Sequence, residues 1–224
     1  MIRIFIGYDS RVPAISSVLA HSINARASEP VSIGLLSLAQ LAKVFHRERN
    51  PLQSTEFSFS RFMVPYLCDY QGFAIFMDND MLVLDDIAKL WALRDERYAV
   101  QCVKHIHVPK EQTKFLGEKQ TRYEKKNWSS VMIFNNAKCK ALTPEFVNTA
   151  SGLELHQFKW LDNDETIGAI PHRWNHLVDY DPPNKNVSLV HYTLGGPFYA
   201  ATRNCEYAEE WFREREDMLR CAQQ

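Results

Sequence analysis

A run of five apolar residues that ends in two carboxylates is the feature that most limits how this chain can fold. Residues 73–77 are apolar without a break, which predicts a strand buried on both faces. Asp78, Asn79 and Asp80 follow directly. Ligands of open α/β sheets bind at the carboxyl ends of the strands, so this triplet stands where a site would form. On these residues alone, it is either a metal-binding pair of carboxylates or a polar turn after a buried strand.

The rest of the chain alternates predicted strands with predicted helices. Short apolar runs predict strands, and apolar residues at helical spacing predict helices. The predicted strands are residues 2–7, 31–36, 73–77, 98–103, 131–135 and 188–192, and the predicted helices are residues 12–27, 59–70 and 204–221. We therefore expect one α/β domain, residues 1–224, with a mostly parallel mixed sheet and helices on both faces.

The composition argues against several classes of protein. A formal net charge of -1 provides no overall field for nucleic acid or an anionic membrane. The five cysteines form no CxxC pair, which argues against a disulfide framework or a thiolate zinc site. The first apolar run is too short for a signal peptide, and no stretch approaches the roughly 18 apolar residues of a membrane span. We expect a soluble cytoplasmic protein with no nucleic-acid partner and no integral membrane segment.

The chemistry of the Asp-Asn-Asp triplet suggests a divalent cation. Asp78 and Asp80 repel one another, and both stay ionised most easily when such a cation lies between them. Oxygen ligands suit Mg2+ or Mn2+, and a diphosphate would complete the shell.

Residues 58–91 resemble the donor-binding core of glycosyltransferase family 8 and its relatives. In those enzymes a helix with an arginine precedes a strand that ends in Asp-x-Asp, and an apolar-acidic stretch with a Leu-Trp pair follows. Arg61 falls where the family has an arginine beside the donor sugar. Asp78 and Asp80 fall on the motif that binds the metal and approaches the ribose, with Asn79 between them in the donor site. The resemblance implies a Rossmann-like GT-A fold and transfer of a hexosyl unit from a nucleotide sugar.

A second match lies at residues 190–198 and resembles the closing motif of the family. It places His191 on the metal, and Gly195 and Gly196 beside the diphosphate. An imidazole among carboxylates favours Mn2+, with Mg2+ as the alternative. Without the Asp-Asn-Asp triplet, the sequence around His191 would favour a hydrogen-bonded core histidine. The lysine usual after the glycine is replaced by Pro197 and Phe198, so another cation or the backbone N–H groups of the Gly-Gly turn must meet the diphosphate.

Weaker matches concern the nucleotide and the sugar. Tyr8 and Asp9 would lie near the base, although both are also ordinary turn residues. Ser130 would contact the donor, but the Trp-Ser-Ser sequence at residues 128–130 replaces the small-residue turn of many members. The sugar is therefore open. The family implies a UDP-sugar donor, and the acceptor is an unidentified saccharide, lipid or protein.

The resemblance also implies transfer with retention of configuration. Asp164 and Glu165 stand where the family has an Asp-Gln pair close to the sugar. Asp164 would bond sugar hydroxyls, and Glu165 would stabilise or attack the reacting carbon, with Arg61 as the third catalytic candidate. The alternative is that these acids cap a helix that begins near Thr166.

Three further features have two readings each. His105 and His107 could be a zinc pair, or solvated or acceptor-contacting histidines. The basic stretch of residues 104–126 could bind an anionic acceptor or be a solvated surface. Three tryptophans could stack on sugars, although large aromatic residues usually lie in the core. They are Trp160, Trp174 and Trp211.

Two other functions compete with the transferase. A phosphohydrolase of the haloacid dehalogenase type also has Asp-x-Asp after an apolar strand, but there it normally closes the first strand and a Thr or Val follows. Here a predicted strand-helix-strand unit precedes the triplet, and Met81 follows it. A non-catalytic protein that binds nucleotide sugars is the second alternative, supported by the missing lysine.

Overall fold

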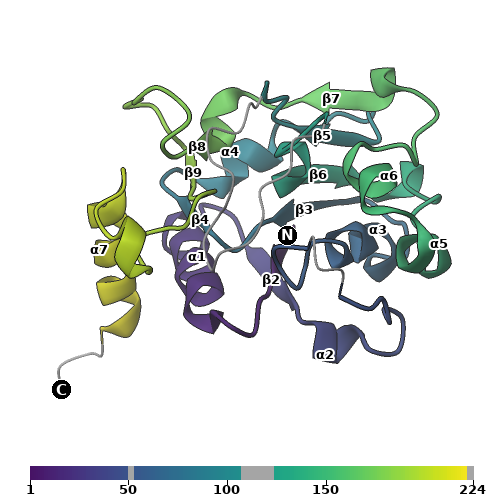
Figure 1. Cartoon of the computed structure of the whole chain (residues 1–224). Coiled ribbons are helices and arrows are strands. Elements are labelled where there is room, and N and C mark those ends of the chain that lie inside the picture. Colours follow the sequence, from purple (N-terminus) through teal and green to yellow (C-terminus); the bar gives the residue numbers. More distant parts are fainter. Residues whose placement is uncertain (50–52, 107–123, 221–224) are drawn as a thin grey trace.

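A six-stranded sheet forms the centre of the computed structural model, which describes residues 1–49, 53–106 and 124–220 (Figure 1). Its strands lie in the order β2-β1-β3-β6-β5-β7. Their bounds are β1 (Ile2–Gly7), β2 (Val31–Leu36), β3 (Phe73–Met77), β5 (Val100–Cys102), β6 (Val131–Asn135) and β7 (Ile167–Ala169). All run in one direction except β6, which is antiparallel to both of its neighbours. The mostly parallel mixed sheet is confirmed, and the carboxyl ends of β1, β3, β5 and β7 meet at one edge.

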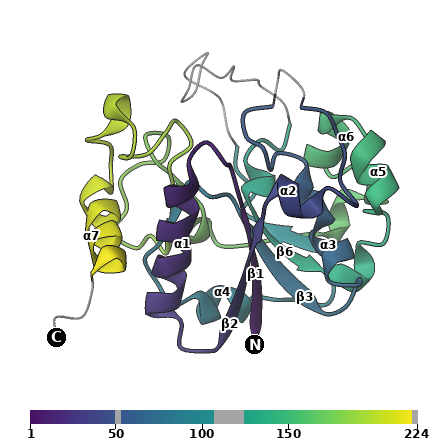
Figure 2. The same cartoon turned by 90° about the horizontal axis from the view of Figure 1, so that it is seen from below.

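Helices cover both faces of this sheet (Figure 2). One layer holds α1 (Pro13–Arg26) and α4 (Ile87–Trp91), and the other holds α2 (Leu38–Leu41), α3 (Val64–Leu67), α5 (Pro144–Thr149) and α6 (Gly152–His156). Successive side chains of a strand point to opposite faces. Ile75 and Met77 of β3 therefore pack in the core with α1, while Ala74 and Phe76 pack in the other core. This double burial is the reason why the strand is apolar at every position.

A smaller second sheet extends from the main one. It consists of β4 (Met81–Val83), β9 (Leu189–His191) and β8 (His176–Leu177), in that order. The strand β4 begins directly after the Asp-Asn-Asp triplet and pairs with β9 in antiparallel fashion. The sequence predicted the strand at residues 188–192 but not its partners.

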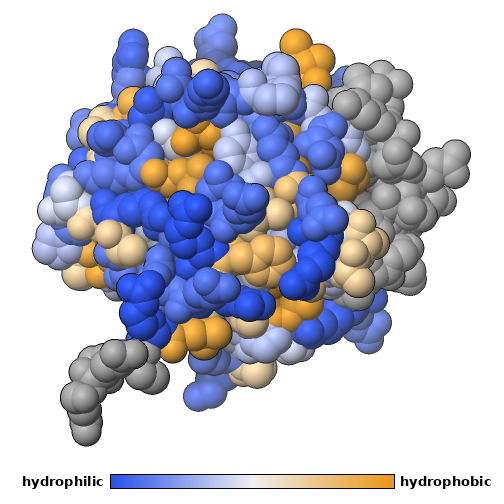
Figure 3. All heavy atoms as spheres, turned by 90° about the vertical axis from the view of Figure 1, so that its left-hand side faces the viewer, coloured by the Kyte–Doolittle hydropathy of each residue, from blue (hydrophilic) through white to orange (hydrophobic). Residues whose placement is uncertain are grey.

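The helix α7 (Ala208–Leu219) packs on the outer side of α1. Trp211 lies in a third core cluster with residues of α1 and the second sheet. Glu214 is buried, and its carboxylate meets His21 at 2.5 Å and Arg26 at 2.7 Å. The surface on this side is mostly hydrophilic, with hydrophobic residues in separate small patches (Figure 3). The contacts of Glu214 with His21 and Arg26 link α7 to α1.

Two predicted helices differ from the structure. Residues 59–70 form a 3₁₀ helix, η1 (Ser60–Met63), followed by the single turn of α3, because Pro65 lacks the N–H that would continue the first turn. The chain then turns through left-handed backbone at Asp69 and Tyr70. The helix expected from Thr166 is wrong, since the next residues pair with β5 as strand β7.

Other expectations agree with the described residues. Trp160, Trp174 and Trp211 are buried, which supports the core interpretation. The four described cysteines are free thiols, and Cys221 lies outside the described residues. Among the described residues, no helix is both long and apolar enough to cross a bilayer.

Candidate metal and donor site

The Asp-Asn-Asp triplet forms a tight turn between the two sheets. The N–H of Asp78 donates to the carbonyl of Ser130, directly before β6, at 2.9 Å. Asn79 is 4% and Asp80 9% exposed. The Nδ2 atom of Asn79 is buried without a hydrogen-bond partner among the described residues. Such a group is costly to bury unless a ligand satisfies it.

The register of the second sheet brings His191 to the triplet. Met81 of β4 lies opposite His191 of β9, and the N–H of Tyr192 donates to the carbonyl of Asp80 at 2.9 Å. His191 Nε2 is then 3.4 Å from Asp80 Oδ1. One ligand atom from each of Asp78, Asp80 and His191 lies within 4.8 Å of the others. The structure therefore brings together the three residues that the sequence predicted as metal ligands.

Arg61 supplies a buried positive charge beside this cluster. Its Nη1 atom lies 2.6 Å from Asp78 Oδ1, with the two side chains 6% and 15% exposed. The guanidinium also donates to the carbonyls of Ser58 and Ser129, at 3.1 Å and 2.8 Å. A buried carboxylate is stabilised in its ionised form by such a partner. Arg61 thus fixes the position of Asp78 and favours its charge.

Asn175 contacts His191 and determines which nitrogen of the His191 ring carries the proton. His191 Nδ1 is 2.9 Å from Asn175 Oδ1, and an amide oxygen only accepts. The Asn175 amide nitrogen donates to Ser130 Oγ at 2.8 Å, which fixes the orientation of the amide. Nδ1 therefore carries the proton, and the lone pair of Nε2 is directed to the Asp80 side. This is the arrangement of a metal-binding histidine with an outer-shell partner.

The end of β1 contributes a further acidic residue, Asp9. Asp9 is 1% exposed and receives two bonds from the Arg11 guanidinium, at 2.8 Å and 2.7 Å. Burial raises the pKa of Asp9, but the bonds and charge of Arg11 outweigh it and leave the pKa below its usual value. Tyr8 beside it is half-buried. Asp9 is therefore a carboxylate that is already paired within the chain.

Tyr199 was not predicted as a site residue. It lies within electrostatic range of Asp80 and Asp9. Burial, followed by the charges of Asp80 and Asp9, raises the pKa of Tyr199 to about 12. The hydroxyl is protonated at neutral pH, as in other tyrosines, and can donate a hydrogen bond.

The Gly-Gly turn after β9 requires glycine for steric reasons. Gly195 has a φ of +110°, and a Cβ on Gly196 would lie 2.4 Å from the ring of Phe198. The N–H of Gly195 donates to the carbonyl of Tyr192 at 3.0 Å. The N–H of Gly195 is therefore bonded within the turn. Of the two glycines, Gly196 is the candidate whose N–H could donate to a diphosphate.

The family of the chain follows from comparison with known proteins. The model of glycosyl transferase family 8 matches residues 21–196. The chain belongs to this family. Protein CDI of Arabidopsis thaliana is 47% identical over 224 residues, which cover 96% of this chain and 86% of that protein. Family 8 membership makes the protein a glycosyltransferase, and it gives no support to the phosphohydrolase or the non-catalytic alternative.

Solved structures show the same fold at low identity. The galactosyltransferase LgtC, in complex with donor and acceptor sugar analogs, matches 99% of this chain and 98% of its own with a TM-score of 0.65 at 15% identity. The glycosyltransferase GlyE of Streptococcus pneumoniae matches 96% of this chain and 60% of its own, with a TM-score of 0.63 at 12% identity. The GT-A fold expected of a family 8 protein is confirmed.

Not every predicted site residue lies with the metal cluster. Asp164 is in η5 (Asp164–Thr166) at the amino end of β7, whereas Asp78 follows the carboxyl end of β3. Its side chain is 68% exposed and meets Lys125 Nζ at 2.5 Å, and Glu165 is exposed. Asn163, whose side chain accepts from the N–H of Glu165, caps this turn. The catalytic roles of Asp164 and Glu165 stay predictions.

Ser130 has a different environment from the one expected of a donor contact. It is 2% exposed, donates to the carbonyl of Asn127 at 2.6 Å and accepts from Asn175. Its visible role is to hold Asn175, and a contact with the donor stays a prediction. His107 and residues 107–123 of the basic stretch lie outside the described residues.

Proposed function

We propose that the protein transfers a hexosyl unit from a UDP-sugar to a saccharide, lipid or protein acceptor, with Mn2+ and with retention of configuration. The cluster of Asp78, Asp80 and His191 in a family 8 protein carries the proposal. Residues 1–224 would form one catalytic domain.

The donor set fits a divalent cation of this kind. Two carboxylates and one imidazole would hold Mn2+, with Mg2+ as the alternative. The bound cation would act as a Lewis acid that neutralises charge on the leaving diphosphate. Asn175 orients His191, and Arg61 keeps Asp78 charged and in place.

The donor would lie along the carboxyl ends of β1 and β3. We assign Tyr8 and Asp9 to the nucleoside, and Asn79 and Arg61 to the ribose and sugar. Gly195 and Gly196 would let the backbone approach the diphosphate closely. Ser130 completes the proposed donor site.

Arg11 is our candidate for the cation that replaces the missing lysine. Its guanidinium donates to Asp9 at the end of β1, and it would exchange that carboxylate for phosphate oxygens when the donor binds. An arginine in that place can bond phosphate oxygens in a bidentate manner.

A thermal-shift screen tests the donor and metal together. We expect UDP with Mn2+ to raise the unfolding temperature more than UDP with EDTA, or than GDP with Mn2+, because the diphosphate completes the metal shell. Equal shifts with UDP and GDP would contradict the uridine assignment. Full transfer activity in EDTA would contradict the metal assignment.

A proton NMR time course tests retention. An α-linked donor should yield an α-linked product first, and an initial β-linked product would show inversion. Glu165→Gln should lower turnover strongly if Glu165 acts near the reacting carbon, whereas an exposed cap would tolerate it. The turnover of Asp164→Asn, compared with that of Glu165→Gln, separates a catalytic role of each residue from a surface role.

A further inference from the structure

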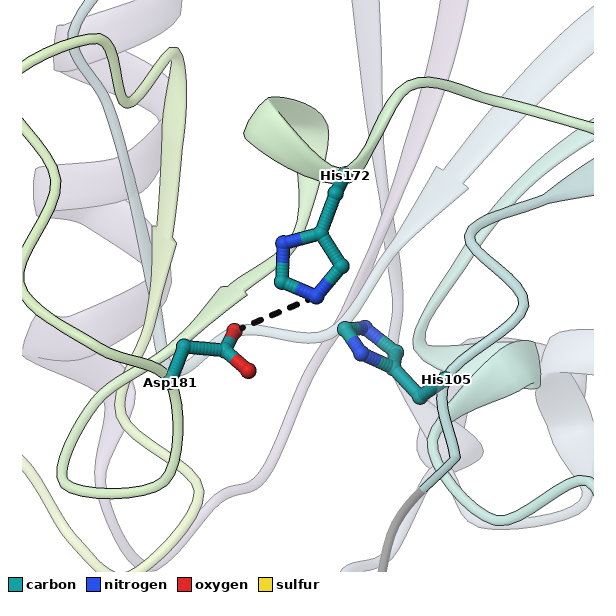
Figure 4. A group of neighbouring side chains, drawn as sticks. All are labelled: His105, His172 and Asp181. Carbon is teal, nitrogen blue, oxygen red and sulfur yellow. Dashed lines mark ion pairs between the residues drawn. The ribbon is translucent and has the colours of Figure 1, made fainter.

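A second group of metal-type ligands lies outside the proposed donor site. His105, His172 and Asp181 each place one ligand atom within 4.8 Å of the others. Figure 4 shows the three side chains pointing toward a common centre from three separate segments. Among the described residues, this group and the Asp78, Asp80 and His191 cluster are the two with such geometry.

The strand register explains why the two histidines meet. Cys102 at the end of β5 lies opposite Ala169 at the end of the parallel strand β7. His105 and His172 each follow these partners by three residues, so they leave the same edge of the sheet side by side. Their ring centroids are 4.9 Å apart, at an angle of 76°.

Asp181 approaches from the other side and is held by its own contacts. One of its oxygens, Oδ2, accepts from the N–H of Leu177 at 2.7 Å and lies 3.9 Å from His176 Nδ1. His176 is buried, and its Nε2 atom is 3.3 Å from Glu206. Carboxylates that bind metals are typically fixed by outer-shell partners of this kind.

The spacing between His172 and Asp181 agrees with a tetrahedral transition metal. His172 Nε2 lies 3.5 Å from Asp181 Oδ2. Ligand atoms on a tetrahedral zinc ion are about 3.4 Å apart, given bond lengths of about 2.1 Å. A cation bound between the two imidazoles and the carboxylate would be coordinated by all three groups.

We propose that His105, His172 and Asp181 bind a transition metal of the zinc type. The set of two imidazoles and one carboxylate suits zinc better than the set of two carboxylates and one imidazole in the donor site. His105 is 7% exposed, while the side chain of His172 is 53% exposed and gives the ion a path of entry. The ion ties the end of β5 to the segment that leads to Asn175.

A zinc titration by calorimetry tests the site. The His191→Gln background disables the donor-site cluster, so that the remaining zinc binding reports on the second group. We expect one zinc ion per chain in that background. Adding His172→Gln or His105→Asn should raise the Kd for zinc by at least about tenfold, as the loss of a ligand or of its support does. Cobalt in place of zinc should show the visible absorption of tetrahedral coordination.

A matched control is His46→Gln, which removes an exposed histidine far from both groups in sequence. It should leave the zinc Kd unchanged. Because His172 is half exposed, His172→Gln should fold normally, which the unfolding temperature without metal verifies. The proposal is overturned if the His191→Gln protein binds no zinc, or if neither His172→Gln nor His105→Asn changes the Kd.

Discussion

The two ligand groups at the carboxyl edge of the sheet differ in both chemistry and origin. The donor-site cluster has two carboxylates from one turn and a single imidazole, and a buried arginine is paired with Asp78. The second group has two imidazoles and one carboxylate from three segments, and it is partly open to solvent. The two proposed sites would thus place a hard cation and a softer one at one edge of the sheet.

The difference also bears on what can be inferred from sequence. Asp78 and Asp80 are neighbours in the chain, so their common position follows from local sequence. His105 and His172 meet only because of the register between β5 and β7. A group of this second kind becomes visible only when strand pairing is known.

The largest expected effect concerns the buried arginine of the first cluster. Arg61→Met leaves Asp78 charged and buried without its partner, which should lower the free energy of unfolding by about 3 kcal/mol or more. Urea denaturation measures this loss. Saturating Mn2+ and UDP should recover part of it, because the cation then neutralises the carboxylates.

The control for that variant is Arg97→Met, which removes an exposed pair with Asp95. It should hardly change the urea midpoint. Equal losses of stability in the two variants would mean that the buried Arg61–Asp78 pair contributes no more to stability than an exposed pair does.

The next effect tests the chemistry of the first cluster. Asp80→Asn removes one negative ligand and should lower sugar transfer at least about a hundredfold, the scale of losing one strong electrostatic stabiliser. Initial rates with Mn2+ measure it. Asp217→Asn, on the exposed end of α7, should keep the wild-type rate. An Asp80→Asn protein with wild-type activity would refute the proposed ligand role.

A smaller effect separates the outer partners of the two groups. Asn175→Leu should weaken Mn2+ binding by about tenfold without changing the Kd for zinc, because Asn175 supports His191. Glu206→Gln should do the reverse, because Glu206 supports Asp181 through His176. Calorimetric titration of both variants with both metals gives the comparison. If each variant weakens the binding of both metals equally, the two ligand groups are not independent.

The smallest expected effect concerns Cys102, which precedes His105 at the end of β5. Burial raises the pKa of Cys102 to about 12, so the thiol stays protonated at neutral pH and is a poor ligand. Cys102→Ala should therefore leave the Kd for zinc unchanged. A marked loss of zinc affinity would mean that the ligand set is incorrect.

Much of the fold could be predicted because it depends on local patterns. The apolar runs at residues 2–7, 31–36 and 73–77 are strands with those same bounds. The direction of β6 and the second sheet could not be predicted, since both depend on pairing between distant segments. Pro65 marked the break between η1 and α3, although the apolar spacing around it was typical of one helix.

The candidate site was predictable to the same extent. Asp78, Asp80 and His191 are recognisable as a motif, and the structure brings them together. The bond between Asn175 and His191 joins residues that are 16 positions apart, and it has no local signal in the sequence. Tyr199 follows the Gly-Gly turn, and its proximity to Asp80 and Asp9 depends on the path of the chain after β9.

The pairing of β4 with β9 has a consequence for the order in which the protein folds. The main sheet is complete with β7, but His191 arrives on β9, which is synthesised later. A nascent chain that has emerged only as far as β7 can therefore build most of its core while its metal site lacks a ligand. Contacts between distant segments form slowly, and domains generally fold as the chain emerges. Acquisition of metal affinity would then follow formation of the main sheet, so that a nascent chain that has reached only β7 would not sequester the donor.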